Sequence, residues 1–102
     1  MKHLIEQFNK AFESRVRLGI MSMLMVQEQV EFNTLKETLE LTDGNLASHL
    51  RALEELEFIK VHKQFVGRKP KTSYQTTRQG RKAFGEHLNA LETLIKNQNK
   101  QL

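Results

Sequence analysis

The sequence contains no cysteine among its 102 residues. Disulfide bonds, thiolate metal sites and cysteine nucleophiles are therefore excluded. Long apolar runs are also missing, because the longest, residues 18–26, is far shorter than the ~20 residues that a membrane-spanning helix needs. The first residues lead into an amphipathic stretch rather than the apolar core of a secretory signal. We expect a soluble cytoplasmic protein with no membrane partner.

Recognisable catalytic motifs are absent as well. The sequence has no glycine-rich phosphate loop, no H-E-x-x-H pair and no G-x-S-x-G elbow. Its four histidines, His3, His49, His62 and His87, are scattered along the chain and lack the spacing of metal ligands. We therefore expect neither an enzyme nor a protein that holds a metal ion or another cofactor.

Acidic residues are missing from residues 60–82, where eight Lys and Arg side chains give a formal charge of +8. Residues 1–59 carry −4 and residues 83–102 are neutral, so the chain as a whole carries +4. A block of one sign concentrates positive potential and attracts polyanions over a long range. A solvated, lysine-rich face is the alternative interpretation of this block.

The length suits a single domain, residues 1–102. Residues 1–13 place apolar side chains at helical spacing, which predicts an N-terminal helix. Ser14 then offers a capping oxygen for a helix to about residue 27, which is so apolar that we expect it to be buried. We interpret the methionines of this helix as core filling, with the lining of a ligand pocket as the alternative.

Residues 34–57 have the pattern of a helix-turn-helix. Residues 30–32 can form a short strand before it, and Asn33 is placed to cap its first helix. After a turn of about three residues, Thr42 caps the second helix, which is positioned for the major groove of DNA. The inner face of this second helix consists of Leu46, Leu50, Leu53 and Glu57.

Residues 58–76 predict a hairpin with a cationic tip. Residues 58–65 alternate apolar and polar side chains, as a half-buried strand does. Residues 66–71 break the strand, and residues 72–76 return as its partner. The buried side of the first strand would consist of Ile59, Val61 and Phe65.

The last helix, residues 77–97, carries an apolar stripe and is capped by Thr76 or Thr77. This stripe would bury little in a lone domain. Pairing it with the apolar face of residues 1–13, or with its twin in a second subunit, removes both surfaces from water. The candidate dimer residues are Leu4, Ile5, Phe8, Phe84, Leu88, Leu91 and Ile95.

Four segments of the chain resemble those of a known group of proteins. They are residues 14–20 (SRVRLGI), 41–50 (LTDGNLASHL), 65–72 (FVGRKPKT) and 77–84 (TRQGRKAF). The group is that of the small bacterial and archaeal winged-helix transcriptional regulators, single-domain relatives of the MarR and ArsR types. The resemblance implies an α+β, mostly helical winged helix-turn-helix with a two- or three-stranded wing sheet. It also implies a homodimer, held by the terminal helices, that places two recognition helices and two wings on duplex DNA.

The sequence departs from this pattern at two points. Thr76 stands where such proteins often have a leucine before the capping threonine. The ArsR-type metal sensors use clusters of Cys and His, which this chain lacks, so metal sensing is not carried over. The sequence does not indicate whether a small-molecule effector is sensed.

The outer face of the second helix in the helix-turn-helix carries residue types that read bases. Asn pairs bidentately with adenine and Arg with guanine, which makes Asn45, Ser48 and Arg51 candidates for base edges. Gly44 lets the helix start approach a phosphate closely, and the cationic wing tip is expected on phosphates or in the minor groove. The full set of candidate DNA-binding residues is Thr42, Gly44, Asn45, Ser48, His49, Arg51, Lys63, Arg68, Lys69, Lys71 and Thr72.

Plainer roles compete with these. Arg51 could pair with Glu55 at i+4, His49 could pack at the core edge, and Arg81 could anchor the last helix. The expected function is a sequence-specific regulator that binds double-stranded DNA. A winged-helix module that binds an acidic protein is the alternative from another class. Single-strand binding ranks third, because it would need exposed aromatic side chains for stacking.

Overall fold

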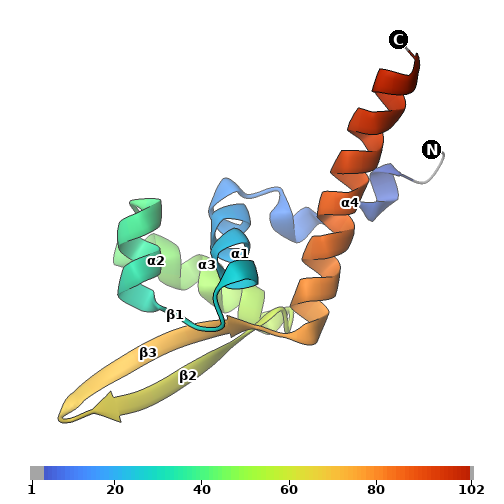
Figure 1. Ribbon diagram of the computed structural model, residues 1–102. Coiled ribbons are helices and arrows are strands. Elements are labelled where there is room, and N and C mark those ends of the chain that lie inside the picture. The colour runs from blue at the N-terminus through green and yellow to red at the C-terminus, as the bar shows by residue number, and fades with distance from the viewer. Residues whose placement is uncertain (1–3, 102) are drawn as a thin grey trace.

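The computed structural model describes residues 4–101, and the side chains of residues 4–97. The helices pack at the base of a small antiparallel sheet with strand order β1-β3-β2, while its hairpin and a long last helix project from the body (Figure 1). This arrangement confirms the predicted winged helix-turn-helix. The elements are η1 (Ile5–Gln7), η2 (Lys10–Phe12), α1 (Arg15–Val26), β1 (Val30–Glu31), α2 (Phe32–Leu39), α3 (Asp43–Glu55), β2 (Ile59–Val66), β3 (Lys69–Thr76) and α4 (Arg78–Gln101).

The core lies where α1, α2 and α3 pack against one another and against the base of the sheet. The methionines of α1 fill it, because Met21 is buried and Met23 and Met25 pack against it. The leucine face of α3 is confirmed, but Glu57 is not part of it, since it lies beyond the helix with a left-handed φ of 63°. The largest fully buried side chains are Phe12, Ile20, Met21, Leu24, Leu35, Leu46, Leu50 and Leu53.

The helix predicted over residues 1–13 is wrong: residues 5–12 form two short 3-10 turns, and residues 1–3 lie outside the described part. Phe8 has an extended backbone (φ −74°, ψ 130°), and the side chain of Asn9 accepts a hydrogen bond from the Ala11 N–H at 2.9 Å. The break lets the Asn9 N–H donate to Nδ1 of His87 at 3.1 Å. Phe8 and Phe12 both pack edge-on against the same imidazole.

Two boundaries near the sheet also differ from the prediction. α2 begins at Phe32, so Asn33 lies inside the helix and does not cap it. β3 begins at Lys69, so the hairpin turn is shorter than expected. It consists of Gly67, with φ of 66°, and Arg68, which matches a two-residue type II′ turn. Phe65 is 74% exposed instead of buried, because it pairs with Pro70 at a tip that extends past the body.

The start of α4 is fastened to the corner between α3 and β2. The Phe58 carbonyl accepts from the Thr77 N–H at 3.0 Å and from the Thr76 hydroxyl at 3.2 Å. The Thr77 hydroxyl donates to the Glu57 carbonyl at 2.7 Å and accepts from the Gly80 N–H at 2.9 Å, so Thr77 is the cap. Thr76, in the position where a leucine is common, is therefore buried with its hydroxyl satisfied.

Replacing Gly80 by alanine is expected to destabilise the fold by about 1–3 kcal/mol, as overpacking of an interior does. A Cβ at this position would lie 2.0 Å from the Phe58 carbonyl oxygen, so α4 would have to shift. Gly85→Ala on the same helix is the matched control, because no atom lies within 4 Å of its Cβ position. Alanine should stabilise the helix there by about 0.5–1 kcal/mol. Urea unfolding measures both free energies, and a Gly80→Ala variant as stable as Gly85→Ala would contradict this packing.

Candidate nucleic-acid interface

Three residues turn the chain from α2 into α3. Glu40 adopts a left-handed φ of 55°, and the Leu41 N–H donates to the Lys36 carbonyl at 3.0 Å, which closes α2. The Thr42 hydroxyl then accepts from the Asn45 N–H at 3.2 Å, so the predicted cap of α3 is confirmed. The turn thus rests on local hydrogen bonds that the sequence could indicate.

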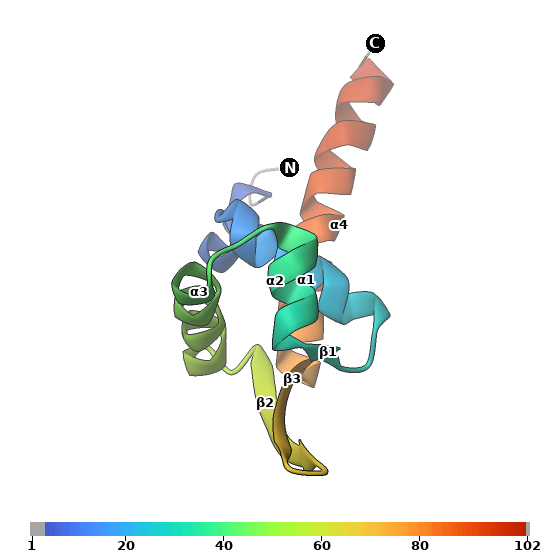
Figure 2. The same cartoon turned by 90° about the vertical axis from the view of Figure 1, so that its left-hand side faces the viewer.

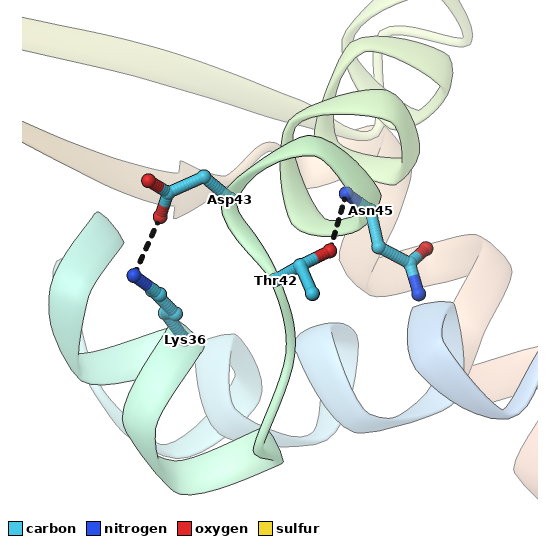
Figure 3. A network of polar contacts seen from close by, with 4 residues as sticks. All are labelled: Lys36, Thr42, Asp43 and Asn45. Carbon is cyan, nitrogen blue, oxygen red and sulfur yellow. Dashed lines mark hydrogen bonds and ion pairs between the residues drawn. The ribbon is translucent and has the colours of Figure 1, made fainter.

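An ion pair joins the two helices across this turn. Nζ of Lys36 lies 2.8 Å from Oδ1 of Asp43, and the side chain of Asn45 extends away from this contact (Figure 3). Asp43 also occupies the first turn of α3, where a carboxylate interacts favourably with the helix dipole. Because Lys36 neutralises Asp43, this carboxylate repels an approaching phosphate less than a free one would.

The outer face of α3 is exposed as predicted. Gly44, Asn45, Ser48 and Arg51 are all open to solvent, while the leucines of the same helix are buried. In the described part of the chain no ion pair joins Arg51 to Glu55, so the competing interpretation of Arg51 has no contact to support it. The face therefore presents an amide, a hydroxyl and a guanidinium group together.

His49 lies at the flank of this face and is half-buried. Nε of Arg17, on α1, donates to its Nδ1 at 3.1 Å, which leaves the proton of the neutral ring on Nε2. Burial first, and the charge of Arg17 second, lower the pKa of His49 below the ordinary 6.5. The lowered pKa favours the neutral ring, which links α1 to α3 through the Arg17 hydrogen bond. The sequence did not indicate this contact, because nothing local relates two residues on different helices.

The titration of His49 tests this contact. Its pKa should lie below 6.5, and Arg17→Met should raise it part of the way back, because burial remains. Since the folded pKa lies below the unfolded one, the stability from this group is present above about pH 6.5 and is lost as pH falls through the lowered value. NMR of the imidazole measures the pKa. Arg15→Met, at an exposed position of α1, should leave the pKa of His49 unchanged. A wild-type pKa of 6.5 or more would refute the contact.

The hairpin divides the predicted wing residues into two groups. Arg68 and Lys69 lie at the exposed tip. Lys63, Lys71 and Thr72 instead line a groove of about 450 Å³ between the hairpin and the start of α2. The structure therefore brings all five residues to one hairpin but gives them two separate positions.

Glu31 and Asn33 line the same groove and were not predicted to belong to the site. The carboxylate of Glu31 lies 3.1 Å from Nζ of Lys71. A strand of two residues has no periodicity of its own, so the sequence could not place Glu31 beside Lys71. The pairing of β1 with β3 does so.

α3 and the hairpin lie at the same end of the molecule, away from the C-terminal half of α4 (Figures 1 and 2). α4 begins at the base of the hairpin, at the opposite end of β3 from the tip, and its first turns carry the cations Arg78, Arg81 and Lys82. One of them, Arg81, donates from Nη1 to the Met25 carbonyl at 3.3 Å, which agrees with an anchoring role. The polar face of α3 and the cationic hairpin therefore form one candidate surface.

A second candidate surface follows α4. Leu4 and Phe84 were predicted to contact a second subunit, but they are only 8% and 2% exposed. They lie within their own subunit, where Phe84 packs on Phe12 with ring centroids 5.0 Å apart. Phe8 packs against His87 of its own chain. The members of the predicted set that remain exposed, by 40–75%, are Ile5, Leu88, Leu91 and Ile95.

Comparison with known proteins identifies the class. Residues 16–95 match the family model described as a winged helix DNA-binding domain, so the chain belongs to that family. The family is one of DNA-binding domains rather than of enzymes. Within the described residues, no helix has both the length and the apolar character needed to cross a bilayer.

Individual proteins are also similar to this chain. An uncharacterised protein of Methanocaldococcus jannaschii is 43% identical over 88 residues, which cover 86% of this chain and 96% of that protein. The solved structure of a transcriptional regulator homologue from Pyrococcus horikoshii is 32% identical, with a TM-score of 0.84 over 95% of this chain and 97% of the other. A regulator of the MarR family from Enterococcus faecalis is 19% identical and shares the fold, with a TM-score of 0.71 over 90% and 84% of the two chains. The predicted resemblance to winged-helix regulators is confirmed.

Proposed function

We propose that the protein regulates transcription by binding a specific sequence in double-stranded DNA. α3 enters the major groove, and the hairpin lies along the backbone or in the adjoining minor groove. The observation that carries this proposal is that the acid-free hairpin and α3, whose outer side chains are polar and exposed, lie at the same end of the molecule (Figures 1 and 2). The cations supply affinity and steering, and α3 supplies sequence discrimination.

Three exposed side chains of α3 read the bases. Asn45 and Arg51 can each make bidentate hydrogen bonds to a purine edge, and such a pair discriminates against the wrong base by ~1–3 kcal/mol. Ser48 lies between them on the same face and adds one hydroxyl. Thr42 serves as the cap that holds the start of α3 in place, and Gly44 leaves room for the backbone of DNA.

The functional unit is a homodimer. The exposed stripe of α4, Leu88, Leu91 and Ile95, is covered by the same stripe of a second copy, and the exposed Ile5 lies on η1, which contacts α4. A two-fold axis then places the two recognition helices ~34 Å apart, one turn of B-DNA. A near-palindromic operator follows from this symmetry.

Substitutions on the two parts of the surface should have different effects. Arg51→Ala should cost ~1–3 kcal/mol on the selected duplex and relax base preference at one position, because a base contact is lost. Lys69→Ala should weaken all duplexes about equally and reduce the log–log salt slope by ~0.9, because a phosphate contact is lost. Fluorescence anisotropy with selected and random duplexes over a salt series measures both. Equal losses on every duplex for Arg51→Ala would remove that residue from the base-reading set.

The α4 interface is tested by Leu91→Glu, which places a charge in the centre of the stripe. The dimer affinity should fall by about thirtyfold or more, because hot spots at the centre of an interface contribute ~2 kcal/mol or more. Thr93→Glu is the matched control, since Thr93 is exposed and lies about 200° around the helix from Leu91. Light scattering over a dilution series gives the dimer affinity. A Leu91→Glu variant that dimerises like Thr93→Glu would place the interface elsewhere.

A second candidate function is a protein-binding module. The exposed Phe65 and Val66 beside Arg68 at the hairpin tip favour it, because apolar and cationic groups together suit an acidic protein surface. In vitro selection of duplexes separates the two functions. Enrichment of a two-fold motif supports the DNA-binding regulator, whereas weak binding without sequence preference supports the protein-binding module.

A further inference from the structure

The groove beside the hairpin contains one paired cation. Of the Lys and Arg side chains in the acid-free block, residues 60–82, only Lys71 forms an ion pair in the part of the chain that the structure describes, and its partner is Glu31. Lys63 and Thr72 line the same groove of about 450 Å³. Glu31 therefore places a negative charge in a groove whose other charged side chains are cations.

The sheet fixes Glu31 in this position. Val30 is buried opposite Tyr74, and Glu31 pairs with Ser73, so the carboxylate lies diagonally across from Lys71, two residues along β3. The side chains of Lys71 and Glu31 remain 38% and 48% exposed. An ion pair this open adds little to stability. Its main effect is to occupy the ammonium group.

We propose that Glu31 competes with the DNA backbone for Lys71 and so limits the affinity of the wing for any duplex. In the free protein the carboxylate holds the ammonium group. On binding, a phosphate that enters the groove displaces the Glu31 carboxylate and takes Lys71. This inference rests on the proposed function, because it requires the hairpin to contact a duplex.

The competition between Glu31 and phosphate for Lys71 should affect all duplexes equally. A phosphate carries no sequence information, so the cost of separating Glu31 from Lys71 is the same for all duplexes. The Glu31–Lys71 ion pair therefore lowers the affinity for non-specific and for specific duplexes by the same factor. It leaves the discrimination by α3 unchanged.

Glu31→Gln tests the proposal, because it keeps the shape of the side chain and removes the charge. Affinity for selected and random duplexes should rise by the same factor, about two- to fivefold, the range that exposed ion pairs span. The salt slope should steepen, by at most ~0.9, as Lys71 becomes fully available to phosphate. Glu28→Gln is the matched control, since it removes an equal charge from an exposed residue of the same segment that has no ion pair in the described part of the chain. The gain in DNA affinity should be smaller for Glu28→Gln than for Glu31→Gln.

A double-mutant cycle isolates the pair. Lys71→Gln should reduce DNA affinity more in the Glu31→Gln background than in the wild type. Equal reductions in the two backgrounds, a gain no larger than that of Glu28→Gln, or a loss of affinity in Glu31→Gln would each overturn the inference while the DNA-binding function stands. A wild-type protein that binds neither the selected nor the random duplex would overturn both this inference and the proposed DNA-binding function.

Discussion

The contact between the start of α4 and the corner after α3 determines how the parts of this domain are oriented. The carbonyls of Leu56, Glu57 and Phe58 all accept hydrogen bonds from residues at or just before the first turn of α4. Because these carbonyls follow directly on α3, the direction of α4 is fixed relative to the outer face of α3. Gly80 is required there, since a larger residue would meet the Phe58 carbonyl. In the proposed dimer, this corner sets the spacing of the two recognition helices.

Two acidic side chains at the candidate DNA surface form ion pairs with lysines. Asp43 is held by Lys36 and Glu31 by Lys71, in both cases through an ion pair that joins two elements. The first pair spans the turn between α2 and α3 and lessens the repulsion of phosphate by Asp43. The second pair occupies a lysine that the proposed complex needs. In the proposed complex, these two similar contacts have opposite consequences for DNA binding, depending on whether the lysine itself faces the DNA backbone.

Local signals predicted much of the fold. Ser14 and Thr42 cap their helices as expected, because a capping hydroxyl acts on an N–H only three residues ahead. The N-terminal segment was mispredicted because its helical spacing competes with a distant partner, His87, that fixes Asn9 and breaks the helix. Phe65 was assigned to the buried side by alternation alone, but the hairpin reaches beyond anything that could cover it. Periodicity identifies a face without showing what lies against it.

The sequence by itself determined the class of the fold, the leucine face of α3 and the concentration of positive charge in residues 60–82, because caps, periodicity and charge are properties of neighbouring residues. Only the tertiary structure decided that Phe84 belongs to the core while Leu91 remains exposed on the same helix. It also decided that His49 accepts a hydrogen bond from Arg17 of α1 and that Glu31 reaches Lys71. These relations depend on packing between segments far apart in the chain, and no local pattern encodes the distance between them.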